Sequence, residues 1–237
     1  MNKDKFIEEV NKLGIELNSE KLNKLDKFYN LLISWNEKIN LTTITEEQDV
    51  YLKHFYDSLT LIKAIDLTKD LTLLDVGTGA GFPGIVLKIV FPNLKITLLD
   101  SLNKRINYLN EIIKELELTD INTICSRCED YTRENREKYD VVVARAVSHL
   151  EILSEIIIPI VKVNGYFVAM KSNINEEITS SSKILKQLDS KIEDVIEFKL
   201  PIENSIRTLV KIQKLVKTNV KYPRKYADIK KNHSKNK

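Results

Sequence analysis

Cysteine and histidine are scarce in this sequence, which limits the kinds of site that it can build. Two cysteines, Cys125 and Cys128, and three histidines occur in 237 residues. The C-x-x-C spacing allows half of a zinc site or a redox pair, but a tetrahedral zinc site needs further ligands and the histidines are scattered along the chain. We therefore expect reduced thiols and no bound metal.

Long apolar runs are also absent. Residues 1–9 mix both charge signs and lack the apolar run of a signal peptide, and no later cluster has the length of a membrane span. Because 43% of the residues are hydrophobic and 30% are charged, the composition is that of an ordinary globular chain. We expect a cytoplasmic monomer that does not associate with membranes.

Glycine is rare, and four of the six glycines lie in one stretch, residues 73–84, which reads Leu-Leu-Asp-Val-Gly-Thr-Gly-Ala-Gly-Phe-Pro-Gly. The run 71–76 is apolar except for Asp75, as in a strand that is covered on both faces. Glycines permit a tight turn and a close approach of the main chain to a ligand, and Pro83 suits the first turn of a helix. A strand, a glycine turn and a helix in this order indicate a site for a nucleotide-like cofactor.

The spacing of the glycines indicates which cofactor. A dinucleotide-binding turn, G-x-G-x-x-G, would place its third glycine at the position of Phe82, whereas here Gly77, Gly79 and Gly81 form G-x-G-x-G. A carboxylate just before the turn, Asp75, would repel a pyrophosphate and favours a cationic amino acid group. The spacing therefore predicts S-adenosylmethionine.

A second carboxylate supports this prediction. Asp100 ends the apolar run 95–99, about 20 residues beyond the glycines, where it can accept hydrogen bonds from two ribose hydroxyls. The alternative is that the glycines only close a tight turn and that Asp100 caps the next helix.

Strands and helices alternate from position 71 onward, which is typical of a mostly parallel sheet with helices on both faces. The last two extended segments can pair as a hairpin at one edge. The expected strands are 71–76, 95–100, 121–126, 139–145, 165–171, 195–200 and 208–215, and the expected helices are 82–91, 103–117, 149–158 and 174–188.

The seven strands define a Rossmann-like α/β core over residues 69–215, preceded by a helical extension over 1–68 and followed by a basic tail over 216–237. In the extension, Ser19 is expected to cap one helix, and Thr45 and Gln48 to form a capping box for another that runs to Ile62. The aromatic residues and His54 on these helices could contact a substrate, but packing in the core is the favoured interpretation.

Ligands of such sheets bind at the carboxyl ends of the strands. Polar residues follow several strands here: Ser101 after the second, Cys128 and Glu129 after the third, and Arg145 at the end of the fourth. We expect residues 128–129 to flank an adenine, and Arg145 to emerge beside the cofactor. A solvated acid at Glu129 and a structural salt bridge at Arg145 are the alternatives.

Charge is concentrated at the C-terminal end. From Lys211 onward there are ten basic residues and one acid, a net charge of +9, whereas the whole chain carries +3. Aromatic and cationic groups alternate at Tyr222, Arg224 and Tyr226, which suits a segment that neutralises phosphates and stacks on bases. A solvated tail that only aids solubility is the alternative, and we expect disorder in the last dozen or so residues.

Taken together, these residues make the chain similar to the bacterial small-subunit ribosomal RNA methyltransferase G family, also called glucose-inhibited division protein B. The similarity covers nearly the whole chain. It is carried by Trp35-Asn36, residues 40–42, His54-Phe55-Tyr56-Asp57-Ser58-Leu59, the stretch 75–84, residues 99–102 with Lys104-Arg105, Ser126-Arg127-Cys128-Glu129, and Ala144-Arg145-Ala146.

The resemblance implies a class I S-adenosylmethionine-dependent methyltransferase that forms 7-methylguanosine in the decoding region of 16S rRNA, as free RNA or within the small ribosomal subunit. Cys128 departs from the family, where alanine is more usual, but a main-chain contact survives this change. The residues that we expect to bind the cofactor are Asp75, Gly77, Gly79, Gly81, Phe82, Asp100, Ser101, Cys128, Glu129 and Arg145, and those that we expect to bind RNA are Lys104, Arg105, Lys221, Arg224 and Lys225.

Methylation of guanine N7 asks little of side chains. The nitrogen already carries an in-plane lone pair, so no general base is needed and positioning should dominate. Arg145 is the expected catalytic residue, because it can orient the carboxylate of the cofactor or guanine O6. The remaining alternatives are a non-catalytic RNA-binding assembly factor, a nicotinamide-dependent oxidoreductase on a similar sheet, and a methyltransferase for a protein or small molecule.

Overall fold

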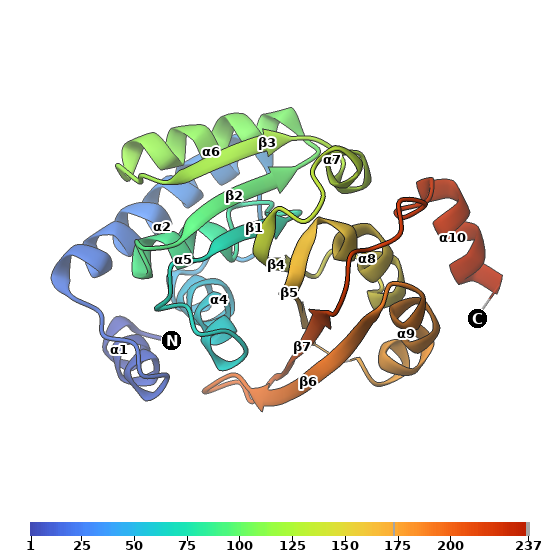
Figure 1. Ribbon diagram of the computed structural model, residues 1–237. Helices are drawn as coiled ribbons and strands as arrows, with labels where there is room; N and C mark the ends of the chain where they lie inside the picture. Colours follow the sequence, from blue (N-terminus) through green and yellow to red (C-terminus); the bar gives the residue numbers. More distant parts are fainter. Residues whose placement is uncertain (173, 236–237) are drawn as a thin grey trace.

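The computed structural model describes residues 1–172 and 174–235, which build one seven-stranded sheet (Figure 1). The strand order is β3-β2-β1-β4-β5-β7-β6; the first five strands are parallel, and β7 runs antiparallel to both of its neighbours. The predicted mostly parallel α/β fold is therefore confirmed. The strands are β1 (Thr72–Val76), β2 (Lys95–Asp100), β3 (Ile121–Cys125), β4 (Tyr139–Arg145), β5 (Val161–Lys171), β6 (Ser190–Lys199) and β7 (Ile206–Lys214).

Two groups of helices cover the two faces of the sheet. Neighbouring residues of β1 point to opposite faces, so Leu73 belongs to one hydrophobic core and Leu74 to the other. The first core is covered by α1 (Lys3–Lys12), α2 (Ser19–Ile39), the segments within 47–63, α5 (Gly84–Val90) and α6 (Asn103–Glu115). The second is covered by α7 (Cys128–Glu134), α8 (Leu150–Ile157), α9 (Asn175–Gln187) and α10 (Tyr226–Lys235).

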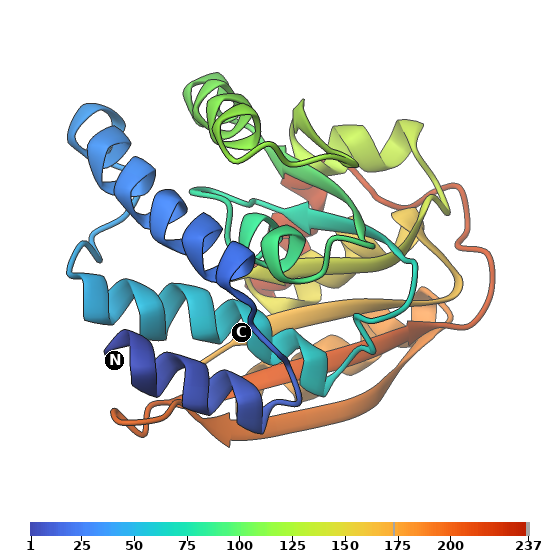
Figure 2. The same ribbon diagram turned by 90° about the vertical axis from the view of Figure 1, so that its left-hand side faces the viewer.

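The N-terminal helices stack on one side of the sheet, as Figure 2 shows in blue to cyan. α2 begins at Ser19, but Asn18 is its cap and accepts a hydrogen bond from the Lys21 amide, so the predicted cap is one residue off. The predicted capping box is wrong: α3 (Glu47–Val50) follows Glu46 without a side-chain cap. In place of one helix to Ile62, α3 continues as a π-helix (Tyr51–Tyr56), α4 (Asp57–Leu59) and a 3₁₀ turn (Thr60–Lys63).

The hydroxyls of two residues accompany this irregular stretch. Ser58 donates to the His54 carbonyl at 2.6 Å, and Thr60 donates to the Asp57 carbonyl at 2.5 Å. Such local bonds compete with the regular helical ladder, and π-turns often accompany functional sites. In this stretch His54 and Asp57 reach Arg145 at the end of β4, and Asp57 also reaches Arg207 of β7.

The C-terminal segment is the main departure from the expected fold. Disorder was expected there, yet residues 226–235 form α10, Tyr222 and Ile229 are buried, and the helix packs against α8. Residues 236 and 237 lie outside the described residues. The apolar side chains of the tail are too widely spaced for the sequence alone to reveal the helix.

Two further boundaries differ from the expectation. β5 begins at Val161 and β6 at Ser190, several residues earlier than predicted, because solvent-facing residues such as Lys162 interrupt the apolar pattern. No helix among residues 1–172 and 174–235 has the length and apolar character to cross a membrane.

Candidate cofactor and acceptor site

The glycine turn after β1 is held by the buried carboxylate of Asp75. Its Oδ2 accepts hydrogen bonds from the Thr78 hydroxyl at 2.6 Å and from the Gly84 amide at 2.9 Å. Burial raises the pKa of Asp75 to about 6. The carboxylate lines neither of the two neighbouring cavities, so it holds the shape of the turn without facing either cavity. The sequence predicted a direct contact between Asp75 and the cofactor.

The glycines of the turn have different tasks. Gly77 has φ 67°, and a Cβ there would lie 2.9 Å from Cγ2 of Val147, so only glycine lets the loop after β4 come this close. Gly81 has φ 94°, and a Cβ would lie 2.6 Å from Cγ1 of Ile85. Gly77 and Gly79 line the larger cavity, whereas Gly81 packs against Ile85 of α5 and lines neither cavity.

Asp100 ends β2 and faces the glycine turn. Its Oδ2 accepts from the Gly79 amide at 3.1 Å and from Nη1 of Arg105 at 3.2 Å, and its Oδ1 accepts from the Leu102 amide at 3.0 Å. Because two carboxylate oxygens offer about four lone-pair positions, Asp100 keeps capacity for a further donor. Arg105 was expected to bind RNA, and the structure ties it to this carboxylate.

A cavity of about 520 Å³ lies beside Asp100 and contains most of the expected cofactor residues. Cys128 and Glu129 begin α7 there, a helix that the sequence did not indicate. Burial raises the pKa of the Cys128 thiol to about 12, so this sulfur is no nucleophile at neutral pH. The lining includes Gly77, Asp100, Ser101, Arg105, Cys128, Glu129 and Arg145.

A second cavity, of about 750 Å³, adjoins the first. Gly77, Arg105 and Arg145 line both cavities, whereas His54, Asp57 and Arg207 line only the larger one. This larger cavity therefore combines the glycine turn with the N-terminal extension and β7.

Two arginines hold one buried carboxylate in the larger cavity. Arg145 Nη1 lies 3.1 Å from Oδ2 of Asp57, and Arg207 Nε lies 3.1 Å from Oδ1 of the same residue. Arg145 also donates to the Lys53 carbonyl at 3.1 Å. The guanidinium of Arg145 is thus fixed by a charge-assisted bond and a main-chain bond at the carboxyl end of β4.

His54 completes this group. Its ring stacks on Phe82 with centroids 4.4 Å apart, and its Nδ1 lies 3.3 Å from Nη2 of Arg145. Because arginine can only donate, Nδ1 accepts and Nε2 carries the proton that faces Thr42 Oγ1 at 3.0 Å. Burial and the charge of Arg145 lower the pKa of His54 to about 3, so the ring is neutral at physiological pH.

The loop after β4 is held in an uncommon conformation. Ala146 has φ 53°, a left-handed conformation that a non-glycine residue adopts at some cost. Lys171 fixes the loop by donating to the Ser148 carbonyl, and Lys171 in turn pairs with Glu177 at 2.9 Å. Strain and restraint at this loop support its assignment to the site.

The expected RNA-binding residues divide into two groups. Lys104, Lys221 and Lys225 are exposed. Arg224 instead inserts toward Glu155, whose side chain is 1% exposed, with Nε and Nη2 at 2.8 and 2.5 Å from its oxygens. Arg224 thus anchors the tail to α8, because the buried carboxylate needs a cationic partner.

Sequence reasoning missed three residues of the larger cavity. Packing was the favoured role of His54, and neither Asp57 nor Arg207 was assigned one, although all three meet around Arg145. In the sequence, residues 54–59 contribute only to the family resemblance. Nothing local in the sequence marks Arg207, which lies 150 residues from Asp57.

Strand order 3-2-1-4-5-7-6, a glycine turn after β1 and an acid at the end of β2 together define a class I methyltransferase, the class that uses S-adenosylmethionine. Solved structures share the fold: a SAM dependent methyltransferase from Aquifex aeolicus has a TM-score of 0.53 and 20% identity, covering 77% of this chain and 98% of that one. A precorrin-6y C5,15-methyltransferase from Geobacter metallireducens has a TM-score of 0.53 and 14% identity, covering 74% and 91%.

The family is shown by sequence. The profile of rRNA small subunit methyltransferase G matches residues 21–206, and the chain belongs to this family. A ribosomal RNA small subunit methyltransferase G from Lysinibacillus sphaericus is 46% identical over 228 residues, covering 95% of this chain and 96% of the relative. One from Acetivibrio thermocellus is 48% identical over 222 residues, covering 93% and 91%. The expected family is thereby confirmed.

Proposed function

We propose that this protein transfers a methyl group from S-adenosylmethionine to N7 of a guanosine in 16S rRNA. The observation that carries the proposal is that Gly77 and Arg145 line both cavities. A cofactor in the smaller cavity and a base in the larger one would meet along this common wall. Family membership supports the class of substrate.

The smaller cavity suits the cofactor by its chemistry. Asp100 has acceptor capacity for ribose hydroxyls, the bare main chain of Gly77 suits the amino acid end, and Cys128 with Glu129 suits the adenine. When bound, the cofactor supplies an electrophilic methyl group on a sulfonium. Asp75 contributes indirectly, through the shape of the turn.

The larger cavity suits a guanine that needs orientation rather than deprotonation. Guanine N7 attacks with its own lone pair and loses no proton, so a general base has no task. His54 agrees with this requirement, because its lowered pKa and its two hydrogen bonds leave it neutral and already engaged. Arg145 orients the acceptor by donating to O6, which leaves N7 open to the methyl group.

Lys104, Lys221 and Lys225 provide the phosphate contacts in this proposal, since all three are exposed. Arg105 and Arg224 support the site and the tail from within the protein, as their bonds to Asp100 and Glu155 require.

Labelled methyl transfer tests the proposal. The protein is incubated with radiolabelled S-adenosylmethionine and either unmodified small subunits or naked 16S rRNA, and the label is mapped by borohydride and aniline cleavage, which detects 7-methylguanosine. We expect one labelled guanosine. Label on another base or on a ribosomal protein would refute the N7 assignment, and tighter binding of NADH than of S-adenosylmethionine would restore the oxidoreductase alternative.

A further inference from the structure

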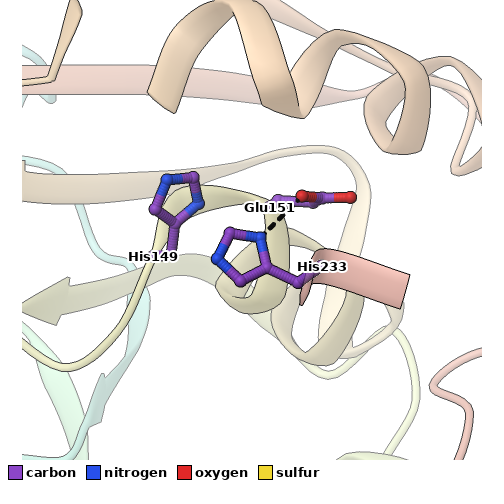
Figure 3. Close-up of side chains that lie close together, drawn as sticks. All are labelled: His149, Glu151 and His233. Carbon is purple, nitrogen blue, oxygen red and sulfur yellow. Dashed lines mark hydrogen bonds and ion pairs between the residues drawn. The ribbon is translucent and has the colours of Figure 1, made fainter. Parts of the chain in front are cut away.

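Three side chains lie close together where the tail helix α10 packs against the start of α8. His149 precedes α8, Glu151 lies in its first turn, and His233 comes from α10 (Figure 3). One ligand atom from each residue lies within 4.8 Å of the other two. This group could not be predicted from the spacing of the residues, because His233 lies 82 residues from Glu151 along the chain.

The three side chains lie almost close enough together to bind one metal ion. Nδ1 of His233 lies 2.9 Å from Oε2 of Glu151, and the two imidazole rings have centroids 4.3 Å apart. Two ligands of a tetrahedral zinc ion with bonds of about 2.0–2.2 Å are about 3.4 Å apart. Side-chain rotations of about an ångström would therefore bring all three donors to one ion.

One of these donors lacks a partner. Nδ1 of His149 is buried and has no hydrogen-bond partner among the described residues. A buried nitrogen without a partner is costly, and a metal ion would satisfy it.

We propose that His149, Glu151 and His233 bind a Zn²⁺ ion that fastens the tail helix α10 to the start of α8. Two imidazoles and one carboxylate are ligands that zinc accepts, and they leave a fourth position for water. His149 also lines the larger cavity, so the ion would connect the basic tail to the wall of the acceptor site. This role is independent of the proposed methyl transfer.

Metal titration tests the proposal on untagged, full-length protein that has been stripped with EDTA. Binding of Co²⁺ is measured by visible absorption and binding of Zn²⁺ by calorimetry, at a pH of about 7.5 where free imidazoles are neutral. We expect one equivalent of each ion to bind. His233→Ala and Glu151→Gln should each weaken the affinity at least about tenfold, because each removes one of three protein ligands.

The matched control is Lys231→Ala, an exposed residue of the same helix, which should leave the affinity unchanged. Zn²⁺ should also slow trypsin cleavage within the tail of the wild type and not of His233→Ala. The proposal fails if the wild type binds no stoichiometric metal, if His233→Ala binds with unchanged affinity, or if Co²⁺ gives a thiolate charge-transfer band that Cys128→Ser abolishes.

Discussion

The two cavities of this protein are built in different ways. The smaller one lies at the carboxyl ends of β1, β2, β3 and β4, where Asp100 is bonded to the main-chain amides of Gly79 and Leu102. The larger one depends on side chains far apart in the sequence, since Arg145 bonds Asp57 and Asp57 bonds Arg207. A site of main-chain groups should tolerate substitutions that a network of buried charges does not.

The largest effect should follow from breaking the charge network at its centre. Arg145→Ala removes the donor to the acceptor base and leaves Asp57 with one cationic partner. We expect methyl transfer to fall by about 10²–10³-fold, the cost of losing one aligned donor in other enzymes. Single-turnover methylation measures the loss, and calorimetry should show less change in cofactor affinity than in rate.

Arg145→Lys is the matched variant. Lysine keeps the charge but cannot reach Asp57, the Lys53 carbonyl and His54 together, so it should recover little activity. Full activity of Arg145→Ala would remove this residue from the site, whereas full activity of Arg145→Lys would reduce its role to charge alone.

Asp57→Asn should be the next most damaging change, although Asp57 contacts no ligand in the proposal. The neutral amide leaves two partly buried arginines without their anion, which we expect to cost about 3 kcal/mol of unfolding free energy. Urea denaturation measures this cost. Methylation measured at urea concentrations well below the unfolding midpoint should also decline. A stable and fully active Asp57→Asn variant would show that the network does not position Arg145.

Two substitutions in the smaller cavity should differ in their effect on the affinity for the cofactor. Asp100→Asn weakens a charged acceptor, so we expect the dissociation constant for S-adenosylmethionine to rise by about 10–100-fold. Cys128→Ala, by contrast, should change it by less than about threefold, because the thiol is buried beside Thr132 and a main-chain contact survives. Equilibrium dialysis measures both, and a large effect of Cys128→Ala would contradict the contrast between the cavities.

The pH dependence of stability should report on His54. Its folded pKa of about 3 lies below the ordinary 6.5, so below pH 6.5 the unfolded chain binds the extra proton and folding loses free energy as pH falls toward 3. Between pH 6.5 and 5 we expect a loss of about 2 kcal/mol.

The comparison that isolates this loss is His54→Gln, which does not titrate. Asp75 acts in the opposite direction, because its raised pKa makes acidification from pH 6 favourable to folding, but wild type and variant share this contribution. The denaturation midpoint should fall further between pH 7.5 and 5 in the wild type than in the variant, because the wild-type fold keeps the His54 ring neutral while the unfolded chain takes up a proton there. An equal pH response of the two proteins would contradict a neutral, buried ring.

The smallest effect concerns the tail. Truncation before residue 216 would leave the buried Glu155 without Arg224, so Lys221→Gln with Lys225→Gln is the cleaner test of RNA affinity. Loss of two phosphate contacts should reduce the slope of log affinity against log salt by about 1–2. An unchanged slope would return these lysines to a role in solubility.

The same contrast explains what the sequence could predict. The β1 turn and Asp100 are local patterns, and the strands alternate regularly with helices, so the fold and much of the smaller cavity could be predicted from the sequence. Arg207 and His233 reach their partners only through tertiary folding, which no spacing encodes. The helix α10 was missed because its stability comes from contacts of Tyr222 and Ile229 with the core rather than from its own composition.

In the proposed mechanism, a cofactor cavity and an acceptor cavity meet at Arg145, so that a guanine N7 is methylated without a general base. Its most direct test is the pH profile of single-turnover methylation on unmodified small subunits, with the product mapped as 7-methylguanosine. We expect one labelled guanosine and a rate that is flat across pH 6–9, where neither guanine N7 nor His54 titrates. A rate that rises tenfold per pH unit through this range, or label on an exocyclic amine, would contradict it.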